Sequence, residues 1–148
     1  AVNLGEVGLG PEPITITHGV QEFAAQPADV GNPHAVVFTD QERLQQLDLT
    51  KAPSWEPTGT FPSGVNIEFV HEVMPGELLM RVYERGCGET LSCGTGVVAS
   101  AAAYRARSGF DAPIQVHVRG GDLTVTFEGD QAWLTGPAVI VARGEYWN

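Results

Sequence analysis

Short runs of apolar residues, or of alternating apolar and polar residues, dominate the chain, and most of them end at Gly, Pro, Asn or Asp. Such runs are typical of β-strands that bury one face. We predict strands at residues 14–18, 35–38, 65–69, 78–82, 114–118, 123–127, 132–134 and 139–141. In the third run, Val65, Ile67 and Phe69 are expected to face the core. Asn66 and Glu68 are then expected to face the opposite side.

Turn residues and a short helical pattern separate these runs. The Gly-containing pairs at 120–121 and 129–130 predict hairpin connections between strands. Asp40 is a suitable N-cap for residues 41–47, where apolar and charged positions alternate as in an amphipathic surface helix. The N-terminal two thirds of the chain therefore carries a surface helix between strands.

A second helical segment differs in kind. From about Ser92 to Ser108 the chain is small or apolar on every side for three turns, and a helix of this composition must be buried. Gly109 suits the position just past the C-terminus of that helix. The pattern predicts an α+β fold, in which a small β-barrel-like sheet is wrapped around one buried central helix.

Length and charge exclude several classes of protein. The chain has 148 residues, which is the size of a single domain with a real core. No apolar run approaches the roughly 18 residues that a membrane span needs. Eight basic and eighteen acidic residues give a net charge of −10, which disfavours binding to nucleic acid or to anionic lipid. We expect a globular protein with no nucleic-acid partner and no membrane partner.

Residue counts also bear on cofactors. Lys51 is the only lysine and lies in a loop-like stretch, which argues against a pyridoxal Schiff base. The two cysteines, Cys87 and Cys93, form neither a disulfide framework nor a paired zinc signature. We expect no metal site, no pyridoxal cofactor and a reducing compartment, the cytoplasm. The chain begins at Ala1 and not at Met, so we interpret it as a fragment or a trimmed chain.

The Gly-rich segment before the central helix is the strongest candidate for chemistry. Cys93 is expected at or beside the first helical turn, where free N–H groups and the helix dipole favour negative charge. Such a position lowers a thiol pKa from about 8.5 to roughly 3.5–7.5. The N–H groups beside Gly94 and Gly96 are suited to bind a carboxylate. We predict that Cys93 is a low-pKa thiol beside a carboxylate site.

A plainer interpretation exists for each feature. A cysteine in a Gly-rich loop is more often a small buried hydrophobe. Two acidic residues and one arginine flank Cys93, however, and the loop joins a strand directly to a buried helix, where functional sites often lie. We expect Cys87 to be a bystander, with an adventitious disulfide to Cys93 left open.

Several motifs in this order resemble one family. They are GNPH at 31–34, GVN at 64–66, ERG at 84–86, GET at 88–90, SCGTG at 92–96 and GPA at 136–138. Together they closely resemble the C-terminal half of the diaminopimelate epimerases, which are cofactor-independent amino-acid isomerases of lysine and cell-wall biosynthesis. The resemblance extends from about residue 1 to about residue 144, and the ending is similar to actinobacterial members.

The resemblance implies how the chain fits into a larger protein. Members of the family have two pseudo-symmetric domains, each a small barrel around a central helix, that face one another across the active site. Residues 1–148 would be one domain, the C-terminal half, and the last ten or so residues would return to the missing N-terminal domain. A homodimer is left open.

The resemblance also implies a mechanism. Epimerisation of LL-diaminopimelate to meso-diaminopimelate would use two cysteines, one removing the α-proton and one returning a proton to the opposite face. Cys93 matches the second cysteine. The first belongs to a Cys-Gly-Asn-Gly string of the N-terminal domain, which does not occur in this sequence. The missing domain is therefore an expected partner.

Site residues follow from the same motifs. Those that match catalytic positions are Cys93, Glu84 and His34, the last two tuning protonation of the cysteine pair. Those that match substrate-binding positions are Asn32, Asn66, Glu84, Arg85, Gly94 and Thr95. The asparagines would bind amino groups, the charged pair would contact ammonium and carboxylate, and the last two would donate backbone N–H groups to the α-carboxylate.

Purely structural interpretations of these residues, and other functions of the chain, stay open. Asn32 is a common turn residue before Pro33, His34 is compatible with a structural histidine, and Glu84 with Arg85 resembles an exposed strand end. A related racemase of another basic amino acid, such as histidine, would have nearly the same framework. A non-catalytic anion-binding module would keep the helix end without needing the thiol.

Overall fold

The strands of the chain form one mixed sheet in the computed structural model, which describes residues 1–11 and 13–147. The strands are β1 (Val2–Glu6), β2 (Gly8–Leu9), β3 (Ile14–His18), β4 (Gln21–Asp29), β5 (Pro33–Phe38), β6 (Ser54–Glu56), β7 (Asn66–Met74), β8 (Glu77–Glu84), β9 (Gly88–Glu89), β10 (Ile114–Val118), β11 (Gly121–Glu128) and β12 (Gln131–Thr135). Their hydrogen-bonded order is β1-β12-β11-β10-β8-β7-β5-β4-β3-β6, and β2 and β9 pair with β4 and β8. Only the β5–β7 and β8–β10 pairs are parallel among those described.

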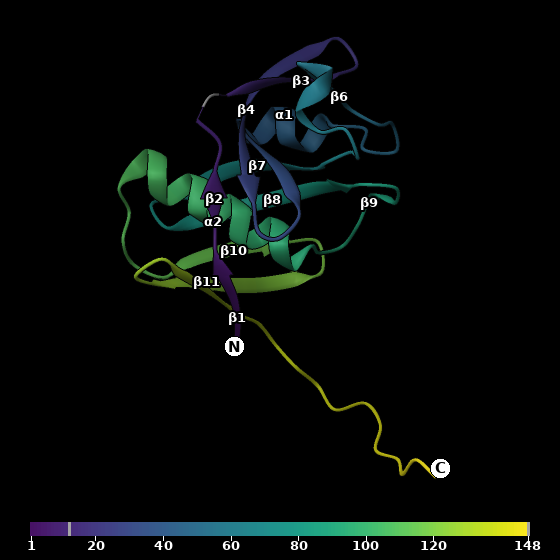
Figure 1. The fold of residues 1–148 in the computed structure, drawn as a ribbon, viewed down its shortest axis with the longest axis vertical. Coiled ribbons are helices and arrows are strands. Elements are labelled where there is room, and N and C mark those ends of the chain that lie inside the picture. Colours follow the sequence, from purple (N-terminus) through teal and green to yellow (C-terminus); the bar gives the residue numbers. More distant parts are fainter. Residues whose placement is uncertain (12, 148) are drawn as a thin grey trace.

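The sheet curls around one helix, α2 (Gly94–Ser108) (Figure 1). Helix α2 contacts β4, β5 and β7 as well as β10, β11 and β12. Because the strand path has two free ends, the sheet is not a closed barrel, and the expected barrel-like form holds only loosely. The predicted α+β fold around one central helix is confirmed.

Small residues make the central helix possible. Val97, Val98 and Ala101 are fully buried, and their short side chains let the sheet approach α2 closely. Cys93 is the N-cap, and Gly109 ends the helix in the left-handed conformation at φ 73°. The Gly109 N–H donates to the Arg105 carbonyl at 2.9 Å, which satisfies one carbonyl of the last turn.

A second apolar cluster lies beneath α1 (Gln41–Gln46) and near the 3₁₀ turn η1 (Thr58–Thr60). The predicted N-cap is confirmed, because an Asp40 carboxylate oxygen accepts the Arg43 N–H at 2.8 Å. The central strands β5 and β7 are therefore covered on both faces, by this cluster on one side and by the cluster around α2 on the other.

This two-sided cover confirms one prediction and adds to it. Asn66 and Glu68 face away from the side of β7 that carries Ile67 and Phe69, as expected, and on that other side Asn66 is 6% exposed and Glu68 is fully buried. A period of two indicates an open face only when nothing packs on it. Here α2 packs against β7, so the polar side chains point into the interior near the N-terminus of the helix.

The other strand predictions have mixed outcomes. The predicted strands between residues 14 and 134 are present, and both predicted hairpins connect β10, β11 and β12. The nine-residue strand β4 was missed because Pro27 within it is unusual for a strand interior. Its Pro27 carbonyl accepts the Gly10 N–H at 2.8 Å, so the proline sits where a short neighbour pairs with β4.

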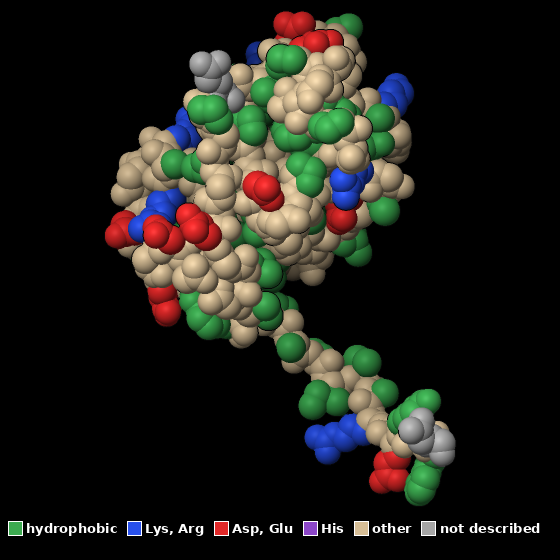
Figure 2. Space-filling view, in the orientation of Figure 1, with side chains coloured by type: hydrophobic (Ala, Val, Ile, Leu, Met, Phe, Trp, Pro, Cys, Tyr) green, Lys and Arg blue, Asp and Glu red, His purple; other side chains and the backbone are tan. Residues whose placement is uncertain are grey.

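The predicted strand at 139–141 is wrong. Residues 136–147 have no helix or strand and extend away from the sheet (Figure 1), with hydrophobic side chains along them (Figure 2). Val139, Ile140 and Val141 are 81%, 73% and 92% exposed. An apolar run forms a strand only beside a partner, and no strand of the described chain pairs with this one.

Candidate catalytic site at the N-terminus of the central helix

Cys93 lies where the extended chain enters α2. Its backbone is extended, with φ −131° and ψ 105°, and its carbonyl accepts the first helical hydrogen bond from Val97 N–H at 2.9 Å. The side chain is 9% exposed and makes no cap hydrogen bond to the helix. The thiol therefore sits at the predicted helix end, but in a buried position.

Burial reverses the expected acidity of this thiol. Burial raises the pKa of Cys93 above its usual value, and the nearby charge of Glu84 acts in the same direction. The Thr95 hydroxyl and the Gly96 N–H favour the thiolate but do not outweigh burial. The low-pKa thiol expected from the helix end is thus corrected to a thiol that stays protonated at neutral pH.

Four side chains and Cys93 form one hydrogen-bonded row. His34 Nδ1 lies 2.7 Å from Glu68 Oε1, and His34 Nε2 lies 3.0 Å from Asn32 Oδ1. Asn32 Nδ2 donates to Thr95 Oγ1 at 3.3 Å. Thr95 Oγ1 lies 3.6 Å from Cys93 Sγ. The row connects the thiol at the helix end to the interior of the sheet.

The parallel pairing of β5 and β7 brings this row together. His34 is the register partner of Asn66. Glu68 lies two residues further along β7, so its side chain is on the same side of the strand as that of Asn66. Sequence reasoning missed Glu68 as a site residue. Its signal was an ionisable residue within the otherwise apolar run Ile67–Val70, which a strand buried on both faces explains.

Asn66 and Arg85 form a separate arrangement beside the row. Asn66 Oδ1 accepts the Arg85 N–H at 3.0 Å, and Asn66 Nδ2 donates to the Pro33 carbonyl at 3.3 Å. Arg85 Nη1 donates to the Ser63 carbonyl at 3.2 Å. The Arg85 side chain crosses Gly64, where a Cβ would lie 2.8 Å from Arg85 Cδ. Asn66 therefore ties the end of β8 to the start of β5.

Glu84 ends β8 and faces the loop that leads to Cys93. Its Oε1 accepts a hydrogen bond from Thr90 Oγ1 at 2.5 Å. Its charge acts on both Cys93 and Glu68. Glu84 thus lies near enough for its charge to act on the Cys93 thiol, although no hydrogen bond joins the two in the described residues.

Glu89 is a structural brace for the same loop. Arg81 donates to both Glu89 oxygens, at 2.7 and 3.0 Å, and Arg119 Nη1 lies 2.8 Å from Glu89 Oε2. The hydrogen bonds from Arg81 hold the pKa of Glu89 below its usual value. Arg81 also donates to the Leu44 carbonyl at 2.7 Å, so this brace ties α1, β8 and β9 together.

Cys87 lies in the exposed turn between β8 and β9, whereas Cys93 is buried, and both are free thiols. The adventitious disulfide left open by the sequence is absent from this structure. Nothing in the contacts of Cys87 assigns it a role.

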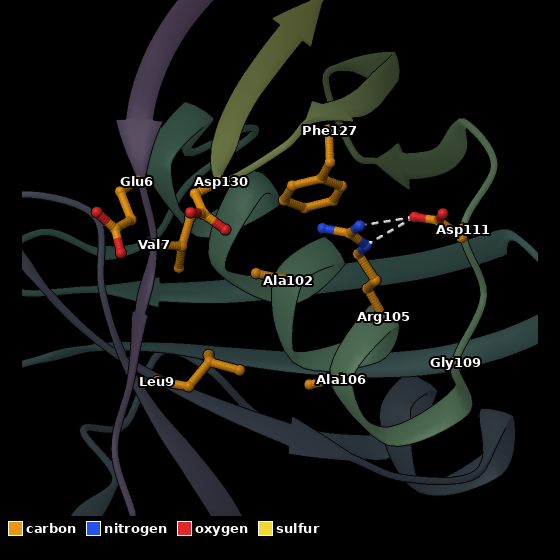
Figure 3. A pocket seen from close by; sticks show the side chains of 10 residues that line it. All are labelled: Glu6, Val7, Leu9, Ala102, Arg105, Ala106, Gly109, Asp111, Phe127 and Asp130. Atoms are coloured by element: carbon orange, nitrogen blue, oxygen red, sulfur yellow. Dashed lines mark hydrogen bonds and ion pairs between the residues drawn. The ribbon is translucent and has the colours of Figure 1, made fainter.

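A hollow at the other end of α2 contains none of these residues (Figure 3). There Arg105 pairs with Asp111 at 2.7 Å and lies over the Phe127 ring at 4.9 Å.

No group of three or more His, Cys, Asp or Glu side chains in residues 1–11 and 13–147 is arranged to hold a metal ion. In that part of the chain, every helix is too short or too polar to cross a membrane.

Comparisons with known proteins identify the family. A profile of the family "Diaminopimelate epimerase" matches residues 27–146. The diaminopimelate epimerase of Streptomyces coelicolor is 43% identical, over 98% of this chain and 53% of the relative. That of Rhodococcus erythropolis is 47% identical, over 92% of this chain and 47% of the relative. The chain belongs to the diaminopimelate epimerase family.

Family membership confirms the resemblance drawn from the motifs, including its similarity to actinobacterial members. The chain spans about half the length of these curated relatives. A solved structure from Pseudomonas aeruginosa, titled a predicted epimerase, aligns with a TM-score of 0.60 at 16% identity. It covers 95% of this chain and 58% of that one, which supports the shared fold.

Proposed function

We propose that this chain is the C-terminal half of an enzyme that epimerises LL-diaminopimelate to meso-diaminopimelate with two cysteines and no cofactor. The observation that carries the proposal is the place of Cys93. It lies at the N-terminus of the central helix of a diaminopimelate epimerase fold, hydrogen-bonded to Thr95 and close to Glu84. This chain supplies one cysteine and part of the substrate site.

Inversion at a carbon needs a base on one face and an acid on the other. The raised pKa of Cys93 suits the acid, because a buried thiol carries its proton at neutral pH. The partner cysteine of the N-terminal domain then acts as thiolate and removes the α-proton. Cys93 delivers its own proton to the opposite face and becomes the thiolate, so the total charge is unchanged. For the reverse reaction the two cysteines exchange roles.

The helix end supports both the substrate and the new thiolate. Backbone N–H groups of Gly94 and Thr95 in the first turn suit the α-carboxylate, because they have no partner within the helix. The Thr95 hydroxyl and the Gly96 N–H favour the Cys93 thiolate once it forms. Fixed dipoles of this kind act strongly when the site is closed to water.

Four further side chains complete the proposed substrate site. Glu84 suits an ammonium group, and the guanidinium of Arg85 suits a carboxylate. Asn32 Oδ1 and Asn66 Oδ1 would each accept a second hydrogen bond, from an amino group of the substrate, beside their present bonds to His34 Nε2 and the Arg85 N–H. His34 and Glu84 would set the protonation of the cysteine pair.

The rest of the enzyme is part of the proposal. The N-terminal domain supplies the partner cysteine and closes the site against water. Residues 139–148 return to that domain, which would cover the exposed side chains of Val139, Ile140 and Val141. We place the enzyme in the cytoplasm, where its biosynthetic substrate is made, and retain the homodimer as a prediction.

The test uses the full-length protein that contains this chain and its N-terminal half. Incubated with LL-diaminopimelate in D₂O, it should form meso-diaminopimelate with deuterium at the α-carbon. Cys93→Ala should abolish both events, whereas Cys87→Ala should keep most of the activity. Turnover of histidine or another basic amino acid in place of diaminopimelate would reassign the substrate. Full activity of Cys93→Ala would overturn the proposal.

A further inference from the structure

Glu68 is a buried carboxyl group that the proposed mechanism does not use. It lies on β7 with an exposed fraction of 0%, and its Oε2 has no hydrogen-bond partner among the residues that the structure describes. An ionised carboxylate in such a place loses its hydration without replacement. Burial accordingly raises the pKa of Glu68. The carboxyl group therefore holds a proton and is a neutral acid in the resting protein.

The proton on Glu68 fixes the tautomer of His34. Glu68 Oε1 lies 2.7 Å from His34 Nδ1, so the neutral acid donates to that nitrogen. His34 then carries its own proton on Nε2, which donates to Asn32 Oδ1 at 3.0 Å. The assignment is self-consistent, because Asn32 uses its Nδ2 to donate to Thr95 Oγ1 and so presents an oxygen to His34.

The same direction continues to the thiol. Thr95 Oγ1 accepts from Asn32, which leaves the Thr95 hydroxyl proton free to donate to Cys93 Sγ at 3.6 Å. Each of the four links thus donates towards the sulfur. Hydrogen bonds that point one way polarise one another, so the last donor is stronger than an isolated hydroxyl.

Glu68 is also held rigidly against the helix end. A Cβ built on Gly96 would lie 2.5 Å from Glu68 Oε1, a distance that only glycine avoids. The close approach places the carboxyl group directly beside the first turn of α2. The first donor of the row and the thiol at its end are therefore fixed to the same helix terminus.

We propose that Glu68 is a positioning residue, which as a neutral acid fixes the His34 tautomer and directs a row of hydrogen bonds at Cys93. In catalysis, this row would stabilise the thiolate that is left when Cys93 gives up its proton. That role rests on the proposed function. Without a donor at Nδ1, His34 can carry its proton there instead. Asn32 would then turn its amide round, and the Thr95 hydroxyl would donate to Asn32 and not to Cys93.

The test measures the Cys93 thiol directly and needs no substrate. In this chain with Cys87→Ser, alkylation by iodoacetamide is followed against pH, and circular dichroism confirms the fold of each variant. Glu68→Met removes the hydrogen-bond donor and keeps a side chain of similar volume. It should raise the pH midpoint of alkylation by about half a pH unit or more, which corresponds to the free energy of one hydrogen bond. Glu68→Gln keeps an N–H donor for Nδ1 and should restore the midpoint.

Two comparisons separate positioning from general disruption. Thr95→Val breaks the last link, so Glu68→Met should add no further shift in a Thr95→Val background. Glu77→Met, at the far end of β8, removes one of the two carboxyl partners of a partly exposed histidine, His117, and should leave the midpoint unchanged. Glu84 on β8, whose charge acts on Cys93, and His34 on β5, which belongs to the row, are the same in all of these variants.

The outcomes that overturn the proposal are distinct. Additive shifts in the double variant would show that Glu68 acts outside the row. A Glu68→Gln midpoint below that of the parent chain would show that Glu68 is charged, since its charge would raise the pKa of Cys93. Failure of the full-length protein to epimerise diaminopimelate would overturn the proposed function but would leave these midpoints unaffected.

Discussion

At the scale of single residues, desolvation decides the chemistry of Cys93. A helix N-terminus favours negative charge, and on that ground the sequence predicts a thiolate. The side chain is nearly buried, however, and loss of hydration raises its pKa. The sequence left a buried cysteine open as the plainer interpretation but could not decide for it, because burial depends on how closely the sheet approaches the helix end. The motif alone located the residue but did not give its charge.

The two cysteines should consequently differ in reactivity in the opposite sense to that expected from the sequence. Cys87 is exposed and should be alkylated first by iodoacetamide at pH 7, whereas Cys93 should react slowly until the pH rises past the usual thiol range. Single-thiol variants, Cys87→Ser and Cys93→Ser, allow each rate to be measured by mass spectrometry. Faster reaction at Cys93 than at Cys87 at neutral pH would contradict the burial argument.

At the scale of elements, the sequence patterns predicted which helices and strands exist better than they predicted what packs against each of them. The central helix and most strands were predictable, because small residues and alternation report directly on burial and period. The burial of Asn66 and Glu68 was not, since it depends on α2 covering their side of β7. Strand β4 was hidden by Pro27. The run at 139–141 has strand composition without a partner strand in the described chain.

The brace between β8, β9 and the β10–β11 turn gives a prediction at this scale. Glu89 is 14% exposed and paired with Arg81 and Arg119, which lowers its pKa in the folded state. A lowered pKa means stability that is present above the unfolded value of about 4.3 and is lost as the pH falls through the folded value. Glu89→Gln should therefore reduce the free energy of unfolding by about 1 kcal/mol at pH 7.

Urea unfolding of the chain at several pH values checks this prediction. The difference between parent and Glu89→Gln should shrink as the pH falls below about 4.3, because the unfolded carboxylate takes up a proton first, and should disappear once the pH has passed the lowered pKa of the folded state. Glu22→Gln, at an exposed position on β4, is the matched control and should show no such difference. A stability difference that is the same at pH 7 and pH 3 would mean that the charge on Glu89 does not hold the brace.

At the scale of the whole molecule, the core lies within this chain, whereas the proposed function divides the site between two domains. Two buried clusters enclose both faces of the central strands, and α2 begins at Cys93 and ends at Gly109 within this core. The candidate residues gather at the N-terminus of α2, and the hollow of Figure 3 lies towards its C-terminus. The chain spans about half the length of its curated relatives, and the proposed function assigns the facing half of the site to an N-terminal domain.

The chain alone should therefore fold without epimerising diaminopimelate. A domain with its own core generally folds independently, so we expect one cooperative unfolding transition in urea. Stereoinversion needs a proton donor and a proton acceptor on opposite faces of one carbon, and of the two thiols here only Cys93 lies at the helix end. LL-diaminopimelate incubated with the chain in D₂O should keep its configuration and gain no deuterium at the α-carbon. Inversion that disappears in Cys87→Ser would instead show that Cys87 and Cys93 work as the pair, and the facing domain would then be unnecessary for the chemical step.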